Sequence, residues 1–195
     1  MDFIEVPARD AIGALAAHSV RQGGLVIKKG EVITAAHVDA LTTNGISRVT
    51  VAKLAPDDRH EDDVALDLAR RAAGENVRVA EPFTGRANLF SEANGVLIID
   101  AGGVDRFNAV DERITIATLP AYRVVETGEM IGTVKIIPFA VEGPVVERVA
   151  AHAGDLLRVA PFRSRKIGVI STLLPGLKPK TITKTLQALS ARLEK

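Results

Sequence analysis

Apolar and polar positions alternate in short runs through the first fifty residues, which is the pattern of strands joined by tight turns. Three runs rich in β-branched residues predict strands at residues 3–6, 25–27 and 48–51. Between the second and third runs, Thr34 is placed to cap a helix that carries Val38 and Leu41. Asn44-Gly45 is placed to end that helix in left-handed backbone. The pattern predicts a small α/β unit over residues 1–54.

Residues 55–162 follow a different pattern. A charged linker leads into an apolar-striped helix that carries Val64, Leu66 and Leu68 and ends at Gly74. Strand-like runs separated by Gly, Asn and Pro then follow at residues 77–79, 96–99, 114–118 and 130–139. A short helix over residues 145–151 returns to an apolar run at 156–159. This region is therefore predicted to be a β-rich middle domain with flanking helices.

The last segment, residues 163–195, reads as the opening of a parallel α/β domain. Ile167, Val169 and Ile170 predict a strand, a Gly-containing turn follows, and a helix begins at about Thr181. A parallel sheet needs several such units to bury both of its faces, so this one is expected to be the truncated first βα unit of a doubly wound α/β domain. The fold class expected for the whole chain is α+β. An apolar strand without sheet partners would favour self-association, which makes a homo-oligomer an expected partner.

Composition narrows the functional classes. The chain has 195 residues, 47% of them hydrophobic and 25% charged, which is typical of globular proteins. A net charge of +1 gives no electrostatic footprint for nucleic acid or for an anionic membrane. The absence of cysteine excludes disulfides and thiolate chemistry. The N-terminal residues do not resemble a signal peptide, so a cytoplasmic location is expected.

Few residue groups suggest chemistry on their own. The run His60-Glu61-Asp62-Asp63 is the densest set of candidate metal ligands, but consecutive helical residues cannot all face one point. A solvated, acid-rich helix start is the favoured interpretation, and no metal site is assigned. Lys135 stands inside an apolar run and is expected either to extend from an edge or to pair with a carboxylate such as Asp100 or Asp111. The sequence contains neither a Walker motif nor a catalytic triad order, so no catalytic residue is assigned.

Two segments carry candidate anion contacts. Lysines at 178, 180 and 184 lie on a loop that follows the predicted last strand and opens a helix, where free backbone amides attract phosphate. The basic run 163–166 is equally well explained as a solvated linker. In residues 83–90, Gly85 permits close backbone approach, while Arg86 and Asn88 offer hydrogen bonds. Turn residues between strands would explain the same pattern without a ligand.

Six segments, in this order along the chain, carry a family resemblance: HSVRQGGLVIKKGEVITAAHVDAL, HEDDVALDLA, FTGRANLF, FNAVDERITIATLP, GEMIGTVKIIPFAV and LLRVAPFRSRKIGVISTLLPGLKPKTITKT. Together they resemble a bacterial family of molybdopterin-binding proteins related to the molybdenum-inserting enzymes of cofactor biosynthesis. The resemblance implies molybdopterin or its nucleotide derivative as the ligand, with the full α/β domain needed to bind it. It also implies cofactor-binding positions, with the pterin phosphate near residues 171–185: Thr172, Pro175, Gly176, Lys178, Lys184, Thr185, Gly85, Arg86 and Asn88.

Three functional hypotheses stay open at this point. The whole protein transfers molybdenum or a nucleotide to or from molybdopterin, or it only holds and delivers the cofactor, or residues 1–160 are a structural or dimerisation module without ligand binding of their own. Deletion of the last thirty residues should leave stability and oligomeric state nearly unchanged under the third hypothesis.

Overall fold

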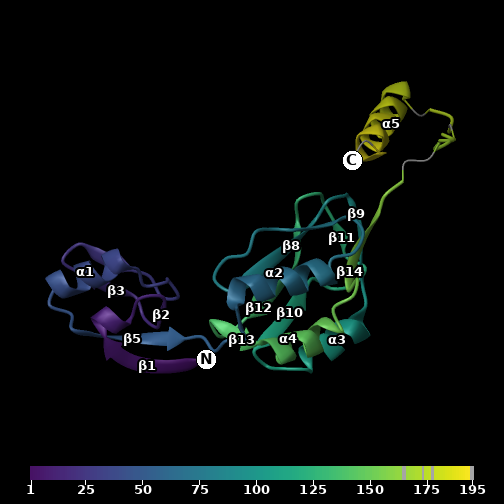
Figure 1. Cartoon of the computed structure of the whole chain (residues 1–195). Helices are drawn as coiled ribbons and strands as arrows, with labels where there is room; N and C mark the ends of the chain where they lie inside the picture. The colour runs from purple at the N-terminus through teal and green to yellow at the C-terminus, as the bar shows by residue number, and fades with distance from the viewer. Residues whose placement is uncertain (164–165, 173, 177, 194–195) are drawn as a thin grey trace. The chain divides into compact units, whose positions relative to one another are not determined.

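The computed structural model describes residues 1–163, 166–172, 174–176 and 178–193. They divide into two compact units, Met1–Phe162 and Arg163–Lys195, whose elements are labelled in Figure 1. Helices and strands are mixed and the strands form several small sheets, which confirms the α+β class.

The N-terminal part of the first unit is a three-stranded sheet with one helix and a short hairpin. Its elements are β1 (Asp2–Pro7), η1 (Ala8–Asp10), β2 (Leu15–Ala16), β3 (Val20–Gln22), β4 (Leu25–Ile27), α1 (Ala35–Thr43) and β5 (Arg48–Lys53). The sheet has the order β1-β5-β2, and β3 pairs with β4. Thr34 caps α1 through a reciprocal capping box with His37, and Gly45 follows the helix at φ +73°. The predicted strands and helix of this region are confirmed.

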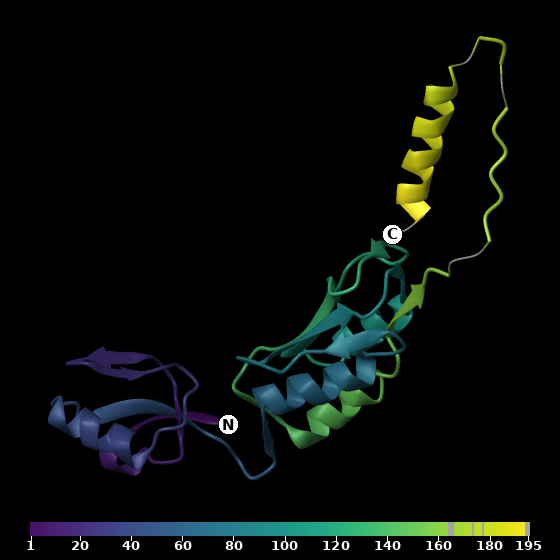
Figure 2. The ribbon, with the colours of Figure 1, turned by 90° about the horizontal axis from the view of Figure 1, so that it is seen from above.

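The middle part of the first unit combines three sheets with three helices. Its elements are β6 (Asp58–His60), α2 (Glu61–Ala72), β7 (Val77–Val79), β8 (Arg86–Ser91), β9 (Gly95–Ile99), α3 (Ala101–Asn108), β10 (Ile114–Thr118), β11 (Val124–Val125), β12 (Met130–Ile136), β13 (Ala140–Glu142), α4 (Gly143–Ala150) and β14 (Leu157–Pro161). The sheet orders are β10-β12-β8-β7, β11-β9-β14 and β13-β6. Helix α2 packs on β8 and β12 and contacts α4, which lies beside it in Figure 2.

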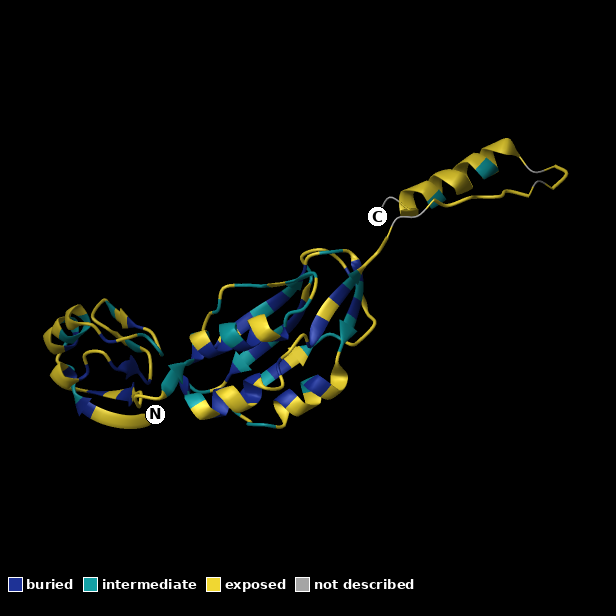
Figure 3. Ribbon diagram, turned by 45° about the vertical axis from the view of Figure 1, so that its right-hand side comes forward, coloured by how far each residue is buried: buried dark blue, intermediate teal, exposed yellow. Residues whose placement is uncertain are grey.

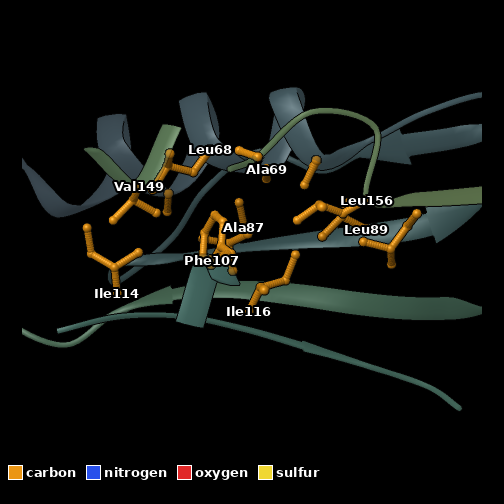
Figure 4. Close-up of a cluster of buried hydrophobic side chains, with 14 of the residues drawn as sticks. Leu68, Ala69, Ala87, Leu89, Phe107, Ile114, Ile116, Val149 and Leu156 are labelled. Carbon is orange, nitrogen blue, oxygen red and sulfur yellow. The ribbon is translucent and has the colours of Figure 1, made fainter. Parts of the chain in front are cut away.

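Helix α2 forms because its apolar residues recur on one face and its termini are satisfied. His60 accepts a hydrogen bond from the Asp62 amide at the start, and acidic side chains in the first turn complement the helix dipole. The buried face of α2 covers an apolar cluster that includes Phe107, Leu89 and Ile114 (Figure 4). A second buried cluster lies around Ile27, Leu41 and Val51.

Two elements of the middle part were not predicted from the sequence. Residues 101–108 form α3, which Asp100 caps by accepting a hydrogen bond from the Gly103 amide. Its two adjacent glycines weaken the helical signal of the sequence, whereas the burial of Phe107 holds it in place. Residues 86–91 form β8, an inner strand of the largest sheet, where a turn between strands was expected.

The second unit contains one helix, α5 (Pro179–Leu193), so the predicted helix is confirmed with its start two residues earlier than expected. The predicted strand over residues 167–170 is wrong, because residues 166–172 have no regular secondary structure. Ile170 is 92% exposed, and none of the described residues of α5 is buried (Figure 3). The backbone amides and carbonyls of a strand need hydrogen-bond partners on a neighbouring strand. None of the described residues pairs in this way with residues 166–172.

Candidate functional site

A pocket of about 500 Å³ opens at the start of α2, within the usual range for small-ligand sites. Its wall comes from β1, the turn after β4, the first residue of α2, the turn before β8, the residue before β10, the end of β12 and the loop after β12. The lining residues are mixed aromatic, aliphatic and charged: Phe3, Lys29, Glu61, Thr84, Arg113, Lys135, Ile137, Pro138 and Phe139. We call it the Glu61 pocket.

Glu61 is the first residue of α2, and its position is fixed by the backbone on both sides. Its amide donates a 2.8 Å hydrogen bond to the carbonyl of Phe139, in continuation of the pairing between β6 and β13. The residue is only 9% exposed, and among the described residues it is the single charged residue of the buried set. Among the described residues, no group forms a hydrogen bond or ion pair with its carboxylate. Its oxygens are not among the buried side-chain atoms that lack a partner, so they are open to the pocket, where water or a ligand can donate to them.

Gly85 makes the space that the Glu61 carboxylate occupies. At φ +68°, it adopts backbone that favours glycine. A Cβ there would collide with Glu61 Oε2 and would lie 2.7 Å from the carbonyl oxygen of Ile136. Gly85 also ties three elements together: its amide donates to Asp62 Oδ1 at 2.7 Å, and its carbonyl accepts from the Ile136 amide at 2.7 Å.

Two lysines bring positive charge to the pocket without forming salt bridges in the described part of the chain. The Lys135 ammonium donates a 2.6 Å hydrogen bond to the Thr84 carbonyl, a neutral acceptor. The Lys29 ammonium lies 5.2 Å from the centre of the Phe139 ring, a cation–π distance. Lys135 also stands directly opposite Arg86 in the antiparallel pair of β12 and β8. Like charges at directly opposed positions repel, so an anion bound beside them would be favoured.

The pKa of the Glu61 carboxyl is raised, chiefly because burial penalises its charged form. Lys135 and Lys29 act in the other direction and favour the carboxylate. The pocket therefore holds a carboxyl group, that of Glu61, whose charged form is disfavoured by burial. Next to it lie the ammonium groups of Lys135 and Lys29, which form no described salt bridge.

Arg113 forms a rigid part of the wall rather than a free cation. Its guanidinium donates to both carboxylate oxygens of Asp111, at 2.9 and 3.0 Å, and lies 2.8 Å from a carboxylate oxygen of Glu142. These contacts raise the pKa of Arg113 and lower the pKa of Asp111. Two carboxylates satisfy this side chain, so it remains charged and fixed in orientation.

The aromatic side of the pocket comes from Phe139 and Phe3. Their ring centres are 6.1 Å apart at an interplanar angle of 50°. Phe139 is 7% exposed and packs beside Leu15 and Ala52, whereas Phe3 is 58% exposed. A Cβ at Gly30 would lie 3.1 Å from the Phe139 ring, so glycine permits this close approach. Flat apolar surface thus lies beside the charged groups.

Three of the residues singled out from the sequence lie in or next to this region. Gly85 supports Glu61, and Arg86 opposes Lys135 across the sheet. Asn88 has a structural partner, because its side-chain oxygen accepts a 2.8 Å hydrogen bond from the Thr133 hydroxyl.

The other predicted cofactor-binding positions belong to the second unit. Thr172, Pro175, Gly176 and Lys178 are exposed and lie outside regular structure, with Pro175 and Gly176 in a turn. Lys184 and Thr185 are exposed on α5, where the Thr185 hydroxyl donates to the Thr181 carbonyl at 3.0 Å. Parts of the predicted loop, Leu173 and Leu177, lie outside the described residues, as do Ser164 and Arg165 of the basic run.

The sequence interpretation missed the central residue of the pocket. Glu61 was read as part of a solvated helix start, and this is wrong because the residue is buried. Of the two alternatives for Lys135, the pairing with Asp100 or Asp111 is wrong, since its ammonium donates to the Thr84 carbonyl, while Asp100 lies 3.6 Å from Arg106 and Asp111 binds Arg113. Lys29, Thr84 and Phe139 carried no signal, because they come from separate parts of the chain that only the fold brings together.

A family model described as a domain of unknown function, DUF8806, matches residues 5–53, which run from β1 to β5. No curated protein and no solved structure matches the chain. Within the described residues, no helix is both long and apolar enough to cross a membrane. The described part of the chain likewise contains no group of three or more His, Asp or Glu residues placed to hold a metal ion.

Proposed function

We propose that the chain acts in molybdenum cofactor biosynthesis or handling as a molybdopterin-binding protein, with the pterin phosphate held in the Glu61 pocket. The observation that carries this proposal is the combination of a buried, unpartnered carboxylate, two lysines and an aromatic ring in one pocket. A phosphorylated pterin offers a flat ring and an anion, which match the Phe139 ring and the two ammonium groups. The sequence resemblance described above supports the same ligand class.

Residues 171–185 are the location that the resemblance implied for the phosphate. Helix α5 begins there at Pro179, and Lys178 and Lys184 are exposed. The Glu61 pocket is the stronger candidate, because two of its lining residues, Glu61 and Phe139, are buried and are joined by a hydrogen bond between their backbones. In this proposal the chain holds the cofactor, and no step of metal transfer is assigned to it.

Isothermal titration of the full chain with neopterin phosphate tests the proposal. We expect saturable binding that Lys135→Met weakens about tenfold, which corresponds to about 1.4 kcal/mol. Lys53→Met, at an exposed position of β5, is the matched control and should bind like the unmodified chain.

The double variant Lys178→Met/Lys184→Met separates the two locations. Loss of binding in that variant, with Lys135→Met unaffected, would move the phosphate to residues 171–185. Absence of binding by the unmodified chain would contradict the proposed function and favour a structural module.

A further inference from the structure

The Glu61 carboxylate has free hydrogen-bond acceptors that face a pocket. The residue is more than nine-tenths buried, and within the described residues no donor reaches its two oxygens. The nearby donors make their described hydrogen bonds elsewhere: the Lys135 ammonium donates to the Thr84 carbonyl and keeps further N–H groups, and the Gly85 amide donates to Asp62. The first amides of α2 are also occupied, by the Phe139 carbonyl and by His60. Donors for these oxygens therefore come from the pocket, from water or from a ligand that replaces it.

The glycines around Glu61 support the same conclusion. Side chains at Gly85 or Gly30 would intrude on the carboxylate or on the Phe139 ring. The chain thus leaves both oxygens open to the pocket while most of the residue is buried. This arrangement costs stability, and a ligand that donates to both oxygens would recover it.

A carboxylate binds best to two parallel N–H groups, because its oxygens match a planar donor fork. A ring with a 2-amino-4-oxo-pyrimidine edge presents such a fork, made of one ring N–H and the exocyclic amino group. Pterins and guanine share this edge, whereas hypoxanthine lacks the amino group and adenine lacks the ring N–H. Phe139 supplies a flat surface for the ring, and Lys29 and Lys135 supply the charge for its phosphate.

We propose that Glu61 is the specificity-determining residue of this pocket and binds the N–H fork of a 2-amino-4-oxo-pyrimidine ring. The pocket would therefore accept guanine nucleotides as well as pterin phosphates and would discriminate against hypoxanthine and adenine nucleotides. This inference rests on the proposed function for the anionic half of the ligand, and it adds the group that reads the ring. A site built to hydrogen-bond a donor rejects an analogue that lacks it, because its own buried acceptor is then left without a partner.

The test compares ligands that differ by single groups, using the full chain. Guanosine monophosphate and inosine monophosphate differ only in the exocyclic amino group. We expect inosine monophosphate to bind about tenfold to a hundredfold more weakly than guanosine monophosphate, and adenosine monophosphate to bind at least as weakly. Glu61→Gln should reduce the difference between the guanine and hypoxanthine nucleotides to less than about threefold, because an amide cannot accept both N–H groups.

Asp63→Asn is the matched control, because Asp63 is an exposed acid two residues further along the same helix. It should keep the full preference for guanine. The pH dependence provides a second readout: guanosine monophosphate binding by the unmodified chain should weaken as acid protonates Glu61 and the phosphate, whereas Glu61→Gln should keep only the part that comes from the phosphate.

The failure of this inference can be told apart from failure of the proposed function. Equal binding of guanosine and inosine monophosphates, together with a loss in Lys135→Met, would overturn the role of Glu61 and leave the anion pocket in place. A preference for guanine that survives in Glu61→Gln would overturn it as well. Absence of neopterin phosphate binding would instead contradict the proposed function itself.

Discussion

Gly85 is the residue on which the geometry of the pocket depends most directly. Its positive φ and its close approach to Glu61 and to the Ile136 carbonyl both exclude a side chain. We expect Gly85→Ala to lower the free energy of unfolding by about 3 kcal/mol, since left-handed strain and overpacking each cost about 1–3 kcal/mol. Chemical denaturation monitored by circular dichroism measures this loss.

Gly128→Ala is the control for the strain alone. Gly128 has φ +87°, and a Cβ there would meet no atom within 4 Å. Its cost should be about 1 kcal/mol, the price of left-handed backbone without a clash. Equal losses in the two variants would contradict the close packing of Gly85 against Glu61.

Glu61 is expected to make the free energy of unfolding fall as the pH rises, whereas the paired carboxylates make it rise. Its pKa in the folded chain is raised above the ordinary 4.5, so its favourable contribution is fully present below that value and is lost as pH rises through the folded pKa. Glu61→Gln should therefore be more stable than the unmodified chain at neutral pH, and this advantage should shrink as the pH falls through the folded pKa of Glu61 and should change no further below 4.5.

The comparison between the two proteins isolates Glu61 from the other acids. Asp58, Asp67, Asp111 and Glu142 have lowered pKa values, so they stabilise the fold at neutral pH and lose this effect in acid. They are present in both proteins, and their contributions cancel in the difference. Urea unfolding at several pH values gives the result, and a difference that does not change with pH would refute the raised pKa.

The candidate site was only partly predictable at the level of single residues. Gly85 and Arg86 could be singled out because Gly and Arg carry local signals for close approach and anion contact. Glu61 could not, because a carboxylate in the first turn of a helix is ordinarily solvated. Its neighbours come from distant parts of the chain, such as Phe139, seventy-eight positions away, whose carbonyl accepts a hydrogen bond from the Glu61 amide.

Local pattern predicted the elements well where it agreed with packing. Helix α2 follows from its apolar stripe and acidic first turn, and β10 has the predicted bounds of residues 114–118. Helix α3 was missed because two glycines mask it, although Asp100 caps it and Phe107 anchors it. Residues 167–170 were predicted as a strand that the structure does not contain. Their β-branched side chains favour a strand, but none of the described residues forms a neighbouring strand with which they could pair.

The buried clusters that the described residues form lie within the first unit. The three clusters together draw on residues from Val6 to Val159, and the described residues of α5 contribute none to them. Stability that arises from apolar burial is therefore expected to come from residues 1–162 alone.

Deletion of residues 163–195 tests this expectation. The shortened chain should keep a melting temperature within about 2 °C of the full chain, because a change of 1 kcal/mol shifts the melting temperature of a chain of this size by about 2–4 °C. Differential scanning calorimetry of both chains at equal concentration gives the comparison. As a positive control, Phe107→Ala in the full chain removes the largest fully buried side chain and should lower the melting temperature by about 6 °C or more. A comparable fall on deletion would show that the last residues stabilise the first unit and would overturn its independence.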